Sequence, residues 1–459
     1  MDYAEFLRQK EILDPATGLD EIPQLPSQLN GFQRDIVSWA LRRGRAALFA
    51  GTGLGKTFMA LSWADAIKRA TGHDTLILTP IAVARQFVME GEKFGIQVTH
   101  CKTQADARAG INVTNYEKLD HFDVSKFGAV VLDESSILKA YNGKTRSALI
   151  SAFRETPFRL AATATPSPND YMELGNHAEF LGIMSYTDML ATFFTHDGGE
   201  TQKWRLKGHA EGAFWRWMCS WSVMLTHPRD LGYDDAGYDL PPLNQFQHTV
   251  RVDKPTNGAL FAVEARTMSE RIAARRDTVA ERVVLAASIT PTDKPFVWWC
   301  NLNTESEALV RAIPGSVEVR GSDSEAEKER KLAAFSSGEI RGLVTKPSIC
   351  GFGMNWQHCN WTGFVGLNDS FEQLYQAIRR FWRFGQTMPV DVHFIAAETE
   401  GAVVANIKRK ESDAERMVRA MVHHMADLSS ETIRGSSRDT PDYLPTQKMI
   451  LPKFLESLR

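Results

Sequence analysis

Short, continuous apolar runs alternate with segments of helical spacing through the first part of the chain. In the segment 56–70, apolar residues recur every three or four positions, which is typical of a helix with one buried face. A second helical pattern covers 84–94. The continuous runs occupy 46–50, 75–80, 111–119, 129–136 and 158–166. Buried strands that alternate with helices predict an α/β fold, in which helices cover both faces of a parallel sheet.

The same alternation returns from residue 295, with apolar runs at 295–302, 342–348, 363–368 and 390–397. It predicts a second parallel-sheet lobe of similar size. The intervening stretch is rich in tryptophan and glycine, and the helical spacing of its tryptophans favours the core of a small, mostly helical insertion over a platform that stacks unpaired bases. These tryptophans are Trp204, Trp215, Trp217 and Trp221.

These patterns predict that the chain is divided into four segments. The arginine-rich segment 257–288 predicts one long helix between the lobes, and 400–428 predicts another helix near the end of the chain. We expect a first lobe at 1–170, the insertion and a linker at 171–245, a basic connecting helix at 246–290, and a second lobe with a C-terminal helix at 291–459.

The composition narrows the class of protein. The 459 residues are 43% hydrophobic and 24% charged, enough for a sizeable core, and the net charge of -3 requires any nucleic-acid binding to use a local basic track. The five cysteines form no C-x-x-C pair, which argues against a zinc site and a disulfide framework. Since no apolar run could span a membrane, we expect a soluble, cytoplasmic protein.

The first candidate for chemistry is the glycine-rich stretch LFAGTGLGKTFMAL at 48–61, which joins a predicted strand to a predicted helix. Such a loop directs backbone N–H groups and the positive end of a helix dipole at one phosphate group. Lys56 would reach the terminal phosphates and Thr57 would hold Mg²⁺. The alternative is a glycine turn beside a surface lysine. The residues that would surround the phosphates are Gly51, Thr52, Gly53, Leu54, Gly55, Lys56 and Thr57.

Two carboxylates end the apolar run at 129–136. Asp133 would hold Mg²⁺ and Glu134 would orient the attacking water. A lone aspartate here could simply cap the next helix, but that role does not explain two adjacent carboxylates at the end of a buried strand.

A third candidate is the segment 372–386, which carries Gln376, Arg379, Arg380 and Arg383. Arginines from a second lobe could stabilise charge on the transferring phosphoryl group when the lobes close. A solvated basic helix is the alternative. The interleaved aromatic side chains favour a packed segment.

These segments belong to an ordered series of motifs that resembles one family. The chain is similar to the superfamily 2 helicase-like ATPases, and among them to the Swi/Snf-like DNA translocases, over roughly residues 25–400; it looks like a compact motor of the kind that phages and mobile elements encode. The matching motifs are LNGFQRDIVSWA, AGTGLGKT, LILTPIAVARQF, VTNYEKL, LDES, ATATPSPND, TKPSICGFGMNW and QAIRRFWRFGQ.

The resemblance implies two RecA-like lobes with a nucleotide cleft between them, and the cofactors ATP and Mg²⁺. It makes Gln33 the reader of adenine and adds Gly353 and Asn355 to the nucleotide site. It gives a coupling role to Thr163, Thr165 and Gln376, and it makes Arg380 and Arg383 the arginine fingers. The chain departs from the family at positions that relay the nucleotide state to DNA, namely Ser135, Ser136, Lys346, Pro347, Arg379 and Trp382.

The function that the resemblance implies is an ATP-driven translocase on double-stranded or branched DNA. Its candidate phosphate contacts are Thr79, Arg85, Thr114, Asn115, Lys346 and Ser348. An RNA or strand-separating helicase is a second interpretation, against which the FGQ ending of the last motif argues. A third is a nucleic-acid clamp that ATP gates with little turnover.

Overall fold

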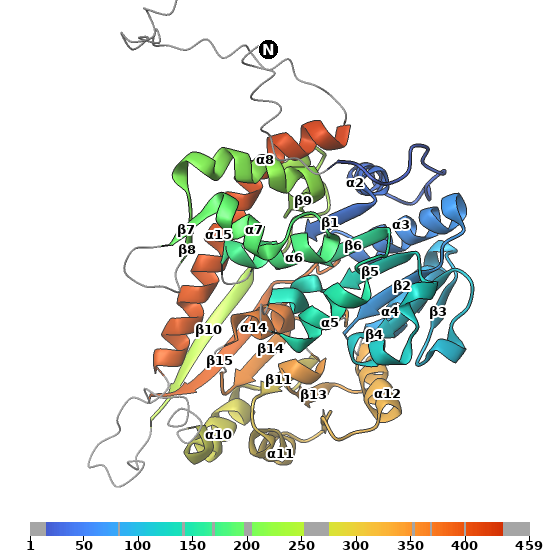
Figure 1. Ribbon diagram of the computed structural model, residues 1–459. Helices are drawn as coiled ribbons and strands as arrows, with labels where there is room; N and C mark the ends of the chain where they lie inside the picture. The colour runs from blue at the N-terminus through green and yellow to red at the C-terminus, as the bar shows by residue number, and fades with distance from the viewer. Residues whose placement is uncertain are drawn as a thin grey trace, which may run out of the picture.

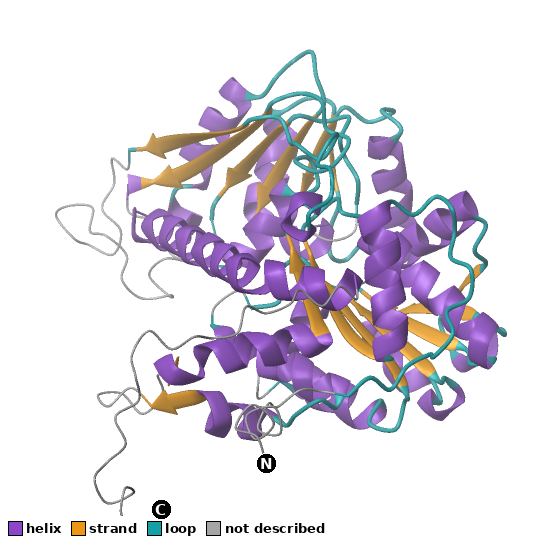
Figure 2. Cartoon of the chain, turned by 90° about the horizontal axis from the view of Figure 1, so that it is seen from above, coloured by secondary structure: helices purple, strands orange, loops and turns teal. Residues whose placement is uncertain are grey.

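Two parallel sheets, each covered by helices, form the two lobes of the computed structural model (Figures 1 and 2). This arrangement confirms the predicted fold class. The structure describes residues 15–80, 83–139, 143–167, 170–196, 204–251, 275–350, 354–367, 370–398 and 401–434.

The first lobe contains a seven-stranded sheet in the order β3-β4-β2-β5-β6-β1-β9, in which every pair is parallel. Alternate residues of its central strands enter two separate cores, as the pleat of a strand requires. The strands are β1 (Arg45–Ala50), β2 (Thr75–Thr79), β3 (Val98–His100), β4 (Ile111–Asn115), β5 (Ala129–Asp133), β6 (Phe158–Thr163) and β9 (Ser222–Leu225).

Helices pack against both faces of this sheet. One core joins the sheet to α2 (Gly31–Arg43), α3 (Lys56–Thr71) and α4 (Ala84–Phe94). The other core joins it to α5 (Lys144–Ala152), α6 (Leu174–Leu181), α7 (Tyr186–Phe193) and α8 (Glu211–Trp221). Two short strands, β7 (Phe194–His196) and β8 (Trp204–Leu206), pair antiparallel beside α7.

The second lobe contains a six-stranded parallel sheet in the order β10-β15-β14-β11-β13-β12. Its strands are β10 (Leu243–Val250), β11 (Phe296–Cys300), β12 (Ser316–Glu318), β13 (Gly342–Thr345), β14 (Trp361–Val365) and β15 (Val390–Ala397). Its helices are α10 (Val279–Ile289), α11 (Asn303–Ala312), α12 (Glu325–Ser336), α13 (Pro347–Cys350) and α14 (Phe371–Ile378).

The structure corrects the predicted connecting helix at 246–290. Residues 246–250 belong to strand β10, whose mixed polar and apolar residues hide it from a search for continuous apolar runs. Of the five arginines in the arginine-rich segment 257–288, Arg266 and Arg271 lie outside the described residues. Arg282 does not form a basic surface, because it is fully buried and its Nη1 lies 2.7 Å from Oε1 of the equally buried Glu305.

The tryptophan-rich stretch is largely part of the first lobe. Strand β9 joins the first sheet, and Trp215, Trp217 and Trp221 lie in the same buried core as β1 and β5. Burial removes these three indole rings from any contact with unpaired bases. Trp204 is partly buried, and its ring lies 3.6 Å from that of His196.

The long helix α15 (Gly401–Arg434) follows the last strand of the second lobe, yet it packs along α8 and β9 of the first (Figure 1). Met421 and Met425 of α15 are buried in the first lobe's core. His424 stacks on Trp215 with ring centroids 5.1 Å apart. The lobes are therefore joined by this helix as well as by the segment between β9 and β10.

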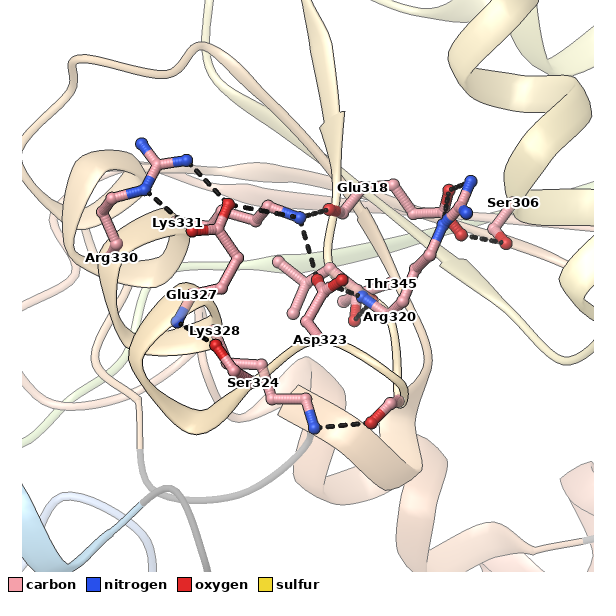
Figure 3. A network of polar contacts seen from close by, with 12 residues as sticks. Ser306, Glu318, Arg320, Asp323, Ser324, Glu327, Lys328, Arg330, Lys331 and Thr345 are labelled. Atoms are coloured by element: carbon pink, nitrogen blue, oxygen red, sulfur yellow. Dashed lines mark hydrogen bonds and ion pairs between the residues drawn. The ribbon is translucent and has the colours of Figure 1, made fainter.

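A polar network fixes the direction of α12 in the second lobe (Figure 3). Lys331 donates to Oδ2 of Asp323 at 2.8 Å and to the carbonyl of Glu318 at 2.9 Å. Ser324 caps the helix by accepting from the N–H of Glu327 at 3.2 Å. The helix consequently begins with its acidic first turn held in one orientation.

Candidate nucleotide site between the lobes

The glycine loop leaves β1 and ends at the first residue of α3, so that the N-terminus of a 16-residue helix points into the site. Gly53 and Gly55 have φ angles of 91° and 82°, a region that glycine adopts at little steric cost. A Cβ on Gly53 would lie 2.7 Å from Cβ of Phe384, and one on Gly55 would lie 2.4 Å from Nε2 of Gln33. Gly53 thus brings the loop directly against the second lobe.

Lys56 lies folded over the loop. Its Nζ donates to the carbonyl oxygens of Ala50 at 2.8 Å and Gly51 at 3.3 Å. Burial lowers the pKa of Lys56, while the carboxylates of Glu134 and Asp133 oppose this shift. An anion bound in the loop would favour the charged ammonium in the same way as these carboxylates.

Asp133 and Glu134 stand at the carboxyl end of β5. The hydroxyl of Tyr116 donates to the backbone carbonyl of Asp133 at 2.7 Å. Glu134 has a φ of 54°, a positive value that no other non-glycine residue has within the described ranges, and such strain is frequent at functional sites. Thr163 donates to Oε2 of Glu134 at 3.4 Å, and the N–H of Thr165 donates to Thr163 at 3.1 Å. Of the two predicted coupling threonines, Thr163 therefore contacts the predicted catalytic carboxylate, and Thr165 contacts Thr163.

The donor set suits Mg²⁺, which prefers carboxylate, hydroxyl and phosphate oxygens. Burial, and then the charge of Glu134, raises the pKa of Asp133 to about 7, while Lys56 opposes the rise. A divalent cation would relieve the repulsion between the two carboxylates, and the Thr57 hydroxyl borders the same cavity. In the described part of the chain, no cluster of three or more His, Cys, Asp or Glu side chains could hold a metal ion. A cation here would therefore depend on the nucleotide's phosphates for further ligands.

A cavity of about 410 Å³ opens between the lobes at this point. Most of the predicted nucleotide-site residues line it. From the first lobe they are Gln33, Thr52, Gly53, Gly55, Lys56, Thr57, Asp133 and Glu134, and from the second they are Asn355, Gln376, Arg380 and Arg383. Gly353 lies outside the described residues.

Gln33 forms a hydrogen bond to the backbone of the glycine loop. Its Nε2 donates to the carbonyl of Leu54 at 2.9 Å, and its Oε1 accepts from the N–H of Asn30 at 3.0 Å, within a capping box at the start of α2. Leu54 is buried, and the N–H of Gly51 donates to the carbonyl of Leu225 at 2.9 Å. Gln33, Gly51 and Leu54 thus shape the loop. That Gln33 also reads adenine stays a prediction.

Arg380 reaches the cavity from the end of α14. Its Nε donates to the carbonyl of Gln376 at 3.1 Å, its Nη2 to Oε1 of Gln376 at 3.3 Å, and its Nη1 to the carbonyl of Met354 at 3.1 Å. Burial lowers the pKa of this guanidinium, while the negative charges of Glu134 and Asp133 oppose that shift. The arginine of the second lobe is therefore held in the field of the first lobe's carboxylates.

Arg383 also lines the cavity, whereas Arg379 turns toward aromatic side chains. The guanidinium carbon of Arg379 lies 4.3 Å from the ring centre of Trp382 and 4.9 Å from that of Tyr375. The two departures from the family pattern, Arg379 and Trp382, thus pack on one another. This geometry supports the predicted register of the arginine fingers.

Three predicted nucleic-acid contacts are buried. Thr79 and Thr114 are fully buried at the ends of β2 and β4, and Asn115 is 4% exposed. Thr79 donates to the carbonyl of Pro80 at 3.1 Å. Side chains this deeply buried offer almost no surface to a phosphate in this arrangement. Their contact with nucleic acid stays a prediction.

The other three candidates lie at the surface. Arg85 is exposed, and its Nη1 lies 3.4 Å from Oε2 of Glu329 on α12 of the other lobe. Lys346 donates to Oδ1 of Asn303 at 2.6 Å, and Ser348 is exposed. These three side chains remain accessible to a phosphate backbone.

The sequence motifs missed a buried histidine that contacts Ser135, the residue after the predicted catalytic carboxylate Glu134. Nε2 of His177, on α6, lies 3.1 Å from Oγ of Ser135, and its ring packs edge-on against Phe49 of β1. Burial lowers the pKa of His177 to about 4, so the ring is neutral near pH 7. In the sequence Ser135 stands out only as a departure from the family, and the separation of 42 positions from His177 conceals the pair.

Residues 32–203 match the family model of the SNF2-related domain. The match spans the glycine loop, the carboxylate pair, and Thr163 and Thr165 at and just after the end of β6. A search of curated proteins found no match to the chain. Within the described ranges, no helix combines the length and apolar character needed to cross a membrane.

Proposed function

Because the chain belongs to the Swi/Snf-like family of superfamily 2 helicase-like proteins, a nucleotide-hydrolysing family, we propose that it is an ATP-dependent translocase on double-stranded or branched DNA. The observation that carries the proposal is the cavity between the lobes, which Lys56 borders from one side and Arg380 and Arg383 border from the other.

The chemistry of this cavity suits a nucleoside triphosphate. The loop N–H groups and Lys56 would bind the β- and γ-phosphates. Thr57 and Asp133 would hold Mg²⁺, which supplies charge neutralisation at the transferring phosphoryl group. Glu134 would orient the attacking water, and Arg380 with Arg383 would stabilise the charge of the transition state.

Residues of both lobes line the cavity, and this division supports the proposal that the protein is a motor. Phosphate-binding groups come from the loop between β1 and α3 and from the start of α3. Arg380 and Arg383 come from the turn after α14, more than 300 residues later in the chain. Hydrolysis can then proceed only when the lobes are closed, so that nucleotide turnover and lobe movement are linked. Alternate closing and opening would move surface groups such as Arg85 and Lys346 along a phosphate backbone.

ATP hydrolysis measured with a panel of nucleic acids tests the proposal. We expect duplex or forked DNA to raise the steady-state rate of the purified chain well above its rate without nucleic acid, because DNA stabilises the closed arrangement. A rate that only RNA raises would favour the RNA helicase. Nucleotide binding without turnover on any ligand would favour the ATP-gated clamp.

Affinity for duplex DNA is expected to depend strongly on salt and little on sequence. The exposed candidates are cations and a hydroxyl, which bind phosphates without reading bases. Each phosphate contact should add about 0.9 to the slope of log affinity against log salt on duplex DNA. Fluorescence anisotropy with two unrelated duplexes at several salt concentrations measures both properties. A flat salt dependence, or a strong preference for one duplex, would argue against this mode of binding.

A further inference from the structure

A lysine shortly after the predicted catalytic carboxylate contacts the helix that precedes the two predicted arginine fingers. Lys139 ends the 3₁₀ turn Ser135–Lys139, which follows Glu134 directly. Its ammonium forms an ion pair with the carboxylate of Glu372, on α14 of the second lobe. The side chain of Glu372 is only 10% exposed and that of Lys139 is 39% exposed. The pair therefore lies across the boundary between the lobes, partly shielded from water.

The first-lobe side of this contact is firmly held. Asn176 of α6 donates from Nδ2 to the carbonyl of Lys139 at 3.1 Å. His177, the next residue, lies 3.1 Å from Ser135 at the other end of the 3₁₀ turn. Asn176, His177 and Ser135 are all buried. Helix α6 consequently fixes both ends of the turn relative to Glu134.

In the second lobe, Glu372 is connected through Gln376 to the predicted arginine finger Arg380. Glu372 and Gln376 are four residues apart, which places them on one face of α14. Arg380 follows in the turn after the helix. The hydrogen bonds from Arg380 to the carbonyl and side chain of Gln376 connect this turn to the helix. A displacement of Glu372 would therefore move the guanidinium of Arg380.

We propose that the Lys139–Glu372 ion pair positions Arg380 against the first lobe's carboxylates when the lobes close. The inference rests on the proposed function, since it concerns the finger of that same ATPase site. Lys139 and Glu372 are positioning residues, since neither side chain lines the cavity proposed to hold the nucleotide. A partly exposed ion pair adds little to folding stability. A misplacement of a catalytic group by about 1 Å, by contrast, can cost up to about 10²-fold in rate.

The test compares charge removal with charge exchange in the full-length chain. Lys139→Met and Glu372→Gln should each lower kcat for ATP about tenfold at saturating duplex DNA, with the nucleotide dissociation constant changed by less than about twofold. The double variant Lys139→Glu/Glu372→Lys restores an ion pair and should recover most of the lost rate. Binding of a fluorescent ATP analogue and thermal unfolding are measured for every variant.

Lys68→Met is the matched control. Lys68 is about as exposed as Lys139, and its ion pair with Asp74 is 2.8 Å long and confined to the first lobe, so its loss should leave kcat unchanged. Should Lys139→Met not fold, Glu372→Gln, which keeps the shape of the side chain, carries the same test.

Single variants as fast as the wild type would overturn the inference while leaving the proposed function intact. A charge-exchanged variant as slow as the single variants would also overturn it. If the wild type itself hydrolyses no ATP with any nucleic acid, the proposed function fails, and the positioning role fails with it.

Discussion

Replacement of Glu134 by glutamine is expected to stop ATP turnover while leaving nucleotide binding in place. The amide keeps the size of the side chain but cannot accept a proton from the attacking water. Loss of such a group costs about 10²- to 10⁴-fold in rate. Thr163 and the strained backbone at Glu134 hold this side chain at the cavity. Asp133 lines the same cavity, but its proposed role is to hold Mg²⁺.

Lys56→Ala should differ from Glu134→Gln by weakening nucleotide binding itself, because Lys56 neutralises phosphate charge. Steady-state hydrolysis together with calorimetric titration of ATP separates the two effects. Glu117→Gln serves as the control, since Glu117 is an exposed carboxylate on the 3₁₀ turn Tyr116–His121 of the same lobe. Hydrolysis at the wild-type rate by Glu134→Gln would show that another group is the catalytic carboxylate.

Arg380→Ala and Arg383→Ala are expected to reduce maximal turnover by about 10³-fold, the effect of an arginine finger in phosphoryl transfer. Both guanidinium groups border the cavity opposite Lys56, and they would act on charge that develops only in the transition state. The nucleotide dissociation constant should therefore change little, which distinguishes a finger from a ground-state phosphate ligand.

Arg379→Ala is the internal control for this prediction. Arg379 packs on Trp382 and Tyr375, and it does not line the cavity to which Arg380 and Arg383 contribute. Its alanine variant should keep most of the maximal rate at saturating DNA. If Arg379→Ala is inactive while Arg380→Ala and Arg383→Ala remain active, the register assigned to the last motif is wrong.

The elements that carry the nucleotide site could be predicted because their signals are local. Strands β1, β2 and β5 are buried on both faces, and a parallel strand in that position reads as a continuous apolar run. Helix α4 was predicted with its observed ends, 84–94, by its amphipathic spacing. Strand β10 has no such run, and β3 and β12 contain only three residues each, too few for a recognisable pattern.

The sequence by itself determined the two-lobe class, the glycine loop and the carboxylate pair, because each depends on residues that are neighbours along the chain. The tertiary structure decided which distant groups meet. It buried Thr79 and Thr114, it placed Arg380 and Arg383 at the cavity and Arg379 on aromatic rings, and it joined Lys139 to Glu372. Residues more than 200 positions apart leave no periodic signal in one sequence. Their contacts arise only when two separately patterned lobes pack against each other.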